Sequence, residues 1–174
     1  VDLQLPQNSG APVATSRIGA SANLDAGEAT RFDRAGGSSY DVNNGTAFNP
    51  ADPSSYNFTT ATTAYDSQGN AHQANLYFRR VDDSTVACGV NNQWQVVASV
   101  DGQVLNPSDT GTAGSASGEA APEHAAVLTF NSDGSLASAT SASSAGPSPS
   151  AVAYSAHNPN NGAATLDLTI DFSG

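Results

Sequence analysis

The chain has 174 residues, the size of one modest domain, and its Leu, Ile, Val and Phe residues make up about 17% of it. That fraction is below the roughly 20% that, together with a high net charge, warns of disorder, so a uniformly packed globule is not expected. Its formal net charge of −11 comes from 16 acidic residues against five basic ones. That charge argues against phosphate backbones and anionic lipid surfaces as partners, and no apolar run approaches the roughly 18 residues of a membrane span.

The opening segment scatters Leu3 and Leu5 among Pro, Gly and Ser, which is typical of an extended connector. One short strand is expected near residues 18–24. The chain begins at Val1 and contains no Met, so we expect a processed form or a fragment. No window shows a helical stripe of large apolar residues, so helix should be scarce.

Alternating apolar and polar residues predict three strands in the middle of the chain, because every second side chain of a strand points to the same face. The expected core-facing sets are a weak one at Tyr56, Phe58, Thr60 and Thr62, a second at Ala74, Leu76 and Phe78, and a third at Trp94, Val96, Ala98 and Val100. Residues 67–70 indicate a hairpin, and Asn44-Gly45 and Asp101-Gly102 are further turn signals.

The second half of the chain contains the clearest strand, over residues 164–172. Its apolar, core-facing side is formed by Ala164, Leu166, Leu168, Ile170 and Phe172. Residues 127–130 and Leu136 flank a turn at 131–134, where Gly134 can take the positive φ of a tight hairpin. Two stretches rich in Ser and Ala, residues 106–121 and 137–162, are expected to be long surface loops.

These elements predict an all-β fold, a small antiparallel barrel or sandwich with long polar loops and little helix. Within it, nucleophilic catalysis would need a Ser or Cys beside a base. The neutral bases are His72, His124 and His157, and each is isolated in the sequence. We therefore predict no catalytic residue, no cofactor-binding site and no enzymatic activity, although spatial clusters cannot be read from the sequence.

Metal-ligand patterns are also missing from the sequence. No two His or Cys residues have the spacing of a zinc site, and Cys88 has no CxxC partner. The oxygen-rich residues 66–70 and 82–83 lack the residue order of a calcium-binding loop, and turn chemistry explains them. We predict no metal site and interpret Cys88 as a free thiol.

Several blocks of the chain, taken in order, resemble the outer, second domain of the bacterial flagellar hook protein and the connector that enters it. The most specific block is the run YDSQGNAH from Tyr65 to His72. The weaker blocks are Asn23-Leu24-Asp25-Ala26, Phe48-Asn49-Pro50, Ser55-Tyr56-Asn57, Leu76-Tyr77-Phe78, Trp94, Val100-Asp101-Gly102, Leu128-Thr129-Phe130-Asn131, Asp133-Gly134-Ser135-Leu136 and residues 168–174. Residues 106–121, residues 137–162 and Cys88 depart from the family's pattern.

The resemblance implies a structural subunit domain of the flagellar hook, the self-assembling curved tube that acts as a flexible joint and transmits torque from motor to filament. It implies that residues 1–42 form a connector and the edge of the inner hook domain, residues 43–172 the outer β domain, and residues 173–174 the start of the return. The implied location is extracellular, in the hook of the bacterial flagellum.

The implied partners are other copies of the hook protein in a helical tube and, through the full-length chain, the hook cap and hook–filament junction proteins. Neither nucleic acid nor membrane is an expected partner. The chain alone is expected to be monomeric.

Two other classes of function stay open. A secreted carbohydrate-binding or adhesive β-sandwich is supported by the acidity and the aromatics, because Trp94 and Tyr77 could stack on a sugar ring, although Trp94 has the parity of a core residue. An exposed row of aromatics would favour this class, whereas burial of Trp94 and Tyr56 would count against it. A small hydrolase would need two carboxylates about 5 to 9.5 Å apart in a cleft.

Overall fold

The computed structural model of the protein describes residues 10–30, 32–33, 48–82, 92–107, 126–141 and 150–173. Their regular structure consists of strands and one short 3-10 turn, η1 (Pro53–Ser55). The strands are β1 (Arg17–Gly19), β2 (Phe32–Asp33), β3 (Phe58–Tyr65), β4 (Ala71–Asp82), β5 (Gln93–Val100), β6 (Gln103–Val104), β7 (Asn106–Pro107), β8 (Ala126–Phe130), β9 (Leu136–Ser141), β10 (Ala151–His157) and β11 (Leu166–Asp171). The predicted all-β class is confirmed.

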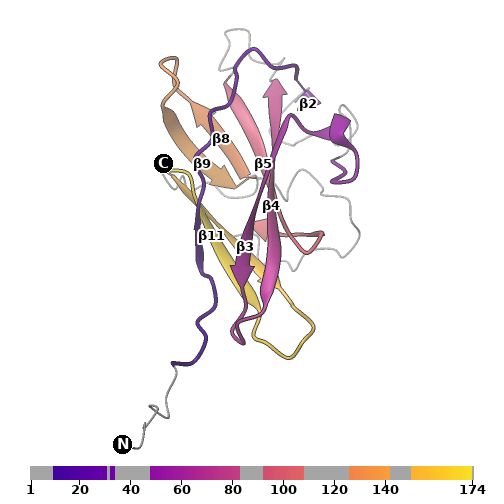
Figure 1. The fold of residues 1–174 in the computed structure, drawn as a ribbon. Coiled ribbons are helices and arrows are strands. Elements are labelled where there is room, and N and C mark those ends of the chain that lie inside the picture. Colours follow the sequence, from indigo (N-terminus) through magenta and orange to yellow (C-terminus); the bar gives the residue numbers. More distant parts are fainter. Residues whose placement is uncertain are drawn as a thin grey trace, which may run out of the picture.

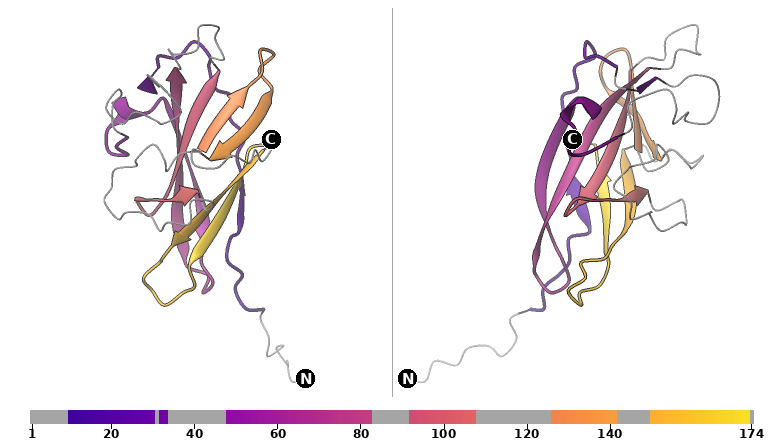
Figure 2. Two further views of the ribbon diagram at one scale, coloured as in Figure 1. Left: turned by 180° about the vertical axis from the view of Figure 1, so that it is seen from behind. Right: turned by 90° about the vertical axis from the view of Figure 1, so that its right-hand side faces the viewer.

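The strands form two sheets (Figure 1). The larger sheet has the order β2-β4-β5-β8-β9, with β3 paired to β4 and β6 paired to β5. The smaller sheet has the order β1-β11-β10-β7. Pairing is antiparallel except between β1 and β11 and between β2 and β4. The turned views show the two sheets as layers, so the chain forms a sandwich (Figure 2).

One hydrophobic core fills the space between the two sheets. Trp94 belongs to this core and has an exposed fraction of 0%. The larger sheet contributes Ala64, Ala74, Leu76, Phe78, Val96, Ala98, Val100, Ala126, Leu128 and Ala139, and the smaller sheet contributes Val152, Tyr154, Leu166, Leu168 and Ile170. The faces predicted for the strands around Leu76, Trp94 and Leu168 are therefore confirmed.

A second, smaller cluster covers the opposite face of the larger sheet. Phe48, Tyr77 and Val97 are buried there, with Tyr56 packed against them. The ring centroid of Tyr77 lies 5.1 Å from that of Phe48 and 5.1 Å from that of Tyr56. Tyr77 thus packs against aromatic side chains of its own chain.

The predicted set of Tyr56, Phe58, Thr60 and Thr62 is wrong in part. Phe58 packs against the main core, with its ring centroid 5.9 Å from that of Trp94, but Tyr56 belongs to the opposite face. Thr60 and Thr62 are exposed. Tyr56 precedes the strand, so strand parity does not apply to it. Strand β3 pairs only with β4 and is an edge strand, and Thr60 and Thr62 line a hollow and not the packed core.

The expected loop over residues 137–162 is wrong in part, because most of β9 and all of β10 lie within it. Residues 158–162 do form a connection without strand, and residues 142–149 lie outside the described part of the chain. Ala139, Val152 and Tyr154 are buried there. The inward side chains include small alanines among serines, so the alternation was too weak to read. Of the other expected loop, residues 106–107 form β7 and residues 108–121 lie outside the described part of the chain.

The remaining boundaries differ by a few residues. The strand expected near residues 18–24 is β1 at 17–19, and the strand expected at 164–172 is β11 at 166–171, with Ala164 exposed and outside it. The turns at residues 67–70, 101–102 and 131–134 join β3 to β4, β5 to β6 and β8 to β9, and Gly134 has a φ of 85°. Asn44-Gly45 lies outside the described residues. None of the described residues forms a helix that could cross a membrane.

Candidate functional site

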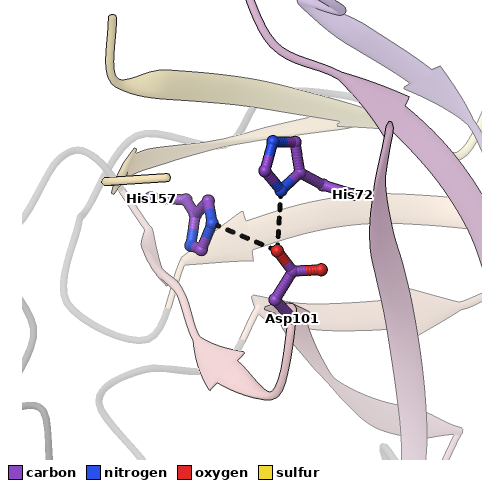
Figure 3. Close-up of side chains that lie close together, drawn as sticks. All are labelled: His72, Asp101 and His157. Carbon is purple, nitrogen blue, oxygen red and sulfur yellow. Dashed lines mark hydrogen bonds and ion pairs between the residues drawn. The ribbon is translucent and has the colours of Figure 1, made fainter. Parts of the chain in front are cut away.

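The side chains of two histidines and an aspartate lie close together (Figure 3). His72 lies near the start of β4, Asp101 in the turn between β5 and β6, and His157 at the end of β10. The Oδ2 atom of Asp101 lies 2.6 Å from Nδ1 of His72 and 3.8 Å from Nε2 of His157. The two imidazole rings lie edge to face, with their centroids 5.7 Å apart. The larger sheet supplies two of these side chains and the smaller sheet the third.

The β5–β6 turn positions Asp101. Asp101 has a φ of 50° and Gly102 a φ of 80°, the left-handed backbone of a tight hairpin turn. The backbone N–H of Asp101 donates to the carbonyl of Gln73 at 2.9 Å, and the N–H of Gln73 donates to Oδ1 of Asp101, also at 2.9 Å. One carboxylate oxygen is thus held by the neighbouring strand, while the other faces the histidines.

A β-bulge in β10 positions His157. Tyr154 pairs with Leu168 and His157 pairs with Leu166, so β10 has one residue more than β11 over this interval. Strict alternation would place His157 on the face opposite to Tyr154. The extra residue reverses this parity, and the His157 side chain is buried with an exposed fraction of 4%.

Asp66 holds His72 from the other side. Its Oδ1 accepts hydrogen bonds from the backbone N–H groups of Gln68 at 2.8 Å and Asn70 at 2.9 Å. Its Oδ2 accepts from the side-chain amides of Asn70 at 2.9 Å and Asn161 at 2.6 Å, and lies 3.3 Å from Nε2 of His72. Asp66 is completely buried. The YDSQGNAH block therefore forms a turn organised around one carboxylate.

The same turn ties the two sheets together. Asn161, whose amide donates to Asp66, lies in the connection between β10 and β11. In the same connection, the backbone N–H of Ala164 donates to Oγ of Ser67 at 3.0 Å. The β3–β4 turn of the larger sheet is thus hydrogen-bonded to the β10–β11 connection of the smaller one.

The electrostatics of the two histidines differ. The hydrogen bond to Asp101 raises the pKa of His72, against the effect of burial and with support from Asp66. Burial lowers the pKa of His157, which favours its neutral form. Burial alone would raise the pKa of Asp101, but the hydrogen bonds from His72 and from the Gln73 N–H, together with the charges of the two histidines, outweigh it and lower the pKa. Burial opposes ionisation of Asp66 too, yet hydrogen bonds, first that from the Asn70 side chain, hold its pKa well below the usual range.

This arrangement can bind a proton or a cation between carboxylate and imidazole groups. Among the described residues, neither His72 nor His157 is hydrogen-bonded to a Ser, Thr or Cys side chain, so the pair has no nucleophile to activate. That no residue is catalytic stays a prediction. His124 and Cys88 lie outside the described residues, as does Asp83.

The contact between His72 and His157 was not found by sequence reasoning. His72 stands in the specific hook-like block, but His157 lies in a stretch interpreted as a loop. No local residue pattern in the sequence marks the bulge that turns His157 inward. A zinc-type spacing search misses such pairs because the fold, not local spacing, brings them together.

The described residues show no exposed row of aromatic side chains that could form a sugar-binding face. Trp94 is buried and Tyr56 is half-buried. The large hydrophobic side chains exposed in the described residues are Val13 and Tyr65, which do not make a row of aromatics. Burial of Trp94 therefore counts against the carbohydrate-binding alternative.

The edge strand β3 offers a different surface. Thr59, Thr60, Ala61, Thr62 and Thr63 are all exposed there. A shallow hollow of about 130 Å³ lies between this strand and residues 18–22 of the opening segment. The surface is built from small side chains, most of them polar.

A known protein family matches most of the chain. The family model described as the flagellar basal body protein FlaE D2 domain matches residues 23–174, which include the YDSQGNAH block, both histidines of the cluster and all strands from β2 to β11. No curated protein matches the chain. Since the family match covers far more than half of the chain, the protein belongs to the flagellar hook protein family, and residues 23–174 correspond to that family's D2 domain.

Proposed function

We propose that this protein acts as the outer domain of a hook subunit, in a self-assembling curved tube that works as a flexible joint and carries torque from the motor to the filament. The family match over residues 23–174 carries this proposal. The matched family is a structural one located at the flagellum and is not known for enzymatic activity. The role is therefore mechanical, and the tube places the domain outside the cell.

The surface of β3 supports a role in contacts that slide. Its exposed Thr and Ala side chains, from Thr59 to Thr63, offer hydrogen bonds and small contacts without a large apolar patch. Neighbouring subunits of a bending tube must shift against each other at low energetic cost. Small polar side chains suit this because no large buried apolar area must be exposed at each step.

The partners proposed are other copies of the hook protein and, through the full-length protein, the hook cap and the hook–filament junction proteins. Residues 1–42 would serve as the connector and the edge of the inner domain, residues 43–172 as the outer domain, and residues 173–174 as the start of the return. The 174-residue chain by itself is then a monomer, and sedimentation at micromolar concentration should give a single species of one-chain mass.

Electron microscopy of hooks tests the proposal. Cells would carry the full-length protein lacking residues 43–171, or carrying Trp94→Ala, which removes the fully buried core side chain; Tyr65→Phe, at an exposed position, is the matched control. We expect straight, stiff or absent hooks and lost swimming for the first two and normal curved hooks for the control. Normal hooks and swimming after the deletion would refute the proposal.

A further inference from the structure

We propose that His72, Asp101 and His157 form a binding site for a divalent transition-metal ion of the zinc class, which joins the two sheets of the sandwich. One ligand atom of each side chain can be chosen so that all three lie within 4.8 Å of one another. Two imidazole nitrogens and one carboxylate oxygen are a donor set that zinc and related ions prefer. Calcium and magnesium favour oxygen ligands alone.

Two of the three donor–donor distances can be compared with the spacing that a tetrahedral ion requires. Ligand bonds of roughly 2.0 to 2.1 Å place two donors on such an ion about 3.4 Å apart. The distances from Asp101 Oδ2 to the His72 and His157 nitrogens, 2.6 Å and 3.8 Å, lie on either side of this value. Asp101 can adjust because it lies in a turn and its side chain is 45% exposed. A water molecule would complete the coordination.

The buried ring of His157 supports the proposed metal site independently of the donor spacing. Both of its ring nitrogens are buried, and neither has a hydrogen-bond partner in the part of the chain that the structure describes. Burying an unpaired polar group is unfavourable. Figure 3 shows that Nε2 of this ring points toward the Asp101 carboxylate. The bulge in β10 places the ring there, and a metal bond would give its nitrogen a partner.

Asp66 is the positioning residue of this site. Its Oδ2 lies 3.3 Å from Nε2 of His72, so an N–H at Nε2 would donate to it and leave Nδ1 to face the ion. Carboxylates commonly orient metal-binding histidines in this way. With both imidazoles neutral, Asp66 and Asp101 contribute two negative charges, which a divalent ion would balance.

Calorimetric titration of the chelator-treated 174-residue chain with ZnCl₂ tests the site. We expect one ion per chain. Asp101→Asn removes a proposed ligand and should weaken binding by at least about tenfold, because loss of an outer-shell partner alone typically costs about 10- to 100-fold. This variant keeps the turn because Asn tolerates a positive φ and retains the oxygen that accepts from Gln73. His157→Gln should weaken binding similarly.

His124→Gln is the matched control, because it removes the third histidine and leaves the cluster intact. It should bind ZnCl₂ as the parent chain does. Co²⁺ bound to the parent chain should show the strong visible absorption of a four-coordinate ion, and Asp101→Asn should lose it. Saturable binding of CaCl₂ with similar affinity, unchanged ZnCl₂ binding by Asp101→Asn, or no binding by the parent chain would each overturn the proposal. These measurements do not depend on hook shape or motility, so the metal site and the proposed hook function are tested separately.

Discussion

Asp171 shows how a single carboxylate fastens the opening segment to the sandwich. It ends β11 and is buried, although strand alternation places it on the polar face. Arg17 of β1 donates to its Oδ2, and the N–H of Ser173 donates to its Oδ1 at 2.9 Å. The hydrogen bond from Arg17, followed by those from Ser173, lowers the pKa of Asp171 to about 2. The residue therefore stays ionised well into the acidic range.

Loss of the Arg17 partner should make the fold more sensitive to acid. The pKa of Asp171 is lower in the folded chain than the roughly 3.9 of an unfolded one, so its contribution is complete above about pH 4 and is lost as the pH falls through about 2. Arg17→Gln should raise the pKa of Asp171 toward its usual value and shift acid unfolding to higher pH. NMR titration of the Asp171 carboxyl and circular dichroism from pH 6 downward measure both effects.

Arg17→Lys is the control for that experiment, because it keeps the positive charge and loses the forked guanidinium. A pKa of Asp171 between those of the parent chain and Arg17→Gln would separate the contribution of the positive charge from that of the hydrogen-bond geometry. If Arg17→Gln left the pKa of Asp171 unchanged, the ion pair would not be the cause of its acidity.

At the scale of elements, the β5–β6 hairpin depends on its turn. Gly102 has a φ of 80°, a conformation that side chains of L residues rarely adopt, and open space surrounds the position of a Cβ atom. Gly19 in β1 has similar open space without a positive φ. The two positions thus differ in backbone conformation and not in crowding.

Gly102→Ala should lower the free energy of unfolding by about 1 kcal/mol or more, because Ala is strained in the left-handed region. Gly19→Ala should change it by less than that or raise it, since Ala restricts the unfolded chain more than Gly does. Urea denaturation of the two variants makes the comparison. Equal stabilities of the two variants would show that the positive φ of Gly102 carries no strain.

Elements whose large apolar residues alternate could be predicted from the sequence. The inward faces of β4, β5 and β11 were predicted because Leu76, Trp94 and Leu168 stand in clear alternation. β9 and β10 were missed, since Ala139 is small and only Val152 and Tyr154 mark the second strand. The bulge before His157 depends on the pairing of β10 with β11, a long-range property that no local pattern encodes. The candidate site could not be predicted for that reason.

The whole molecule should unfold as one unit, because both sheets share a core. The hydroxyl of Tyr154 in β10 donates to the carbonyl of Val96 in β5 at 3.2 Å, which links the smaller sheet to the larger one. Tyr154→Phe removes this bond and should lower the free energy of unfolding by about 1 kcal/mol. Trp94 fluorescence and far-UV circular dichroism should report the same shift in urea, and Tyr65→Phe should cause none.

Independent melting of the smaller sheet would give a different result. Tyr154→Phe would then move an early step in circular dichroism and leave the fluorescence transition of Trp94 unchanged. Coincident transitions are expected because Tyr154 and Trp94 belong to the same buried cluster.

The parallel pairing of β1 with β11 has a mechanical consequence. Arg17 lies opposite Thr169 and Gly19 opposite Asp171, and further bonds run from Thr169 N–H to the Ser16 carbonyl and from Ala20 N–H to the Asp171 carbonyl. Consider a force that pulls on the N-terminal end of β1 and on the C-terminal end of β11. Because the two strands are parallel, the force pulls them in opposite directions along their common axis. It loads these hydrogen bonds in shear, so they must break together. They do not open one after another, as the bonds of a zipper-like geometry would.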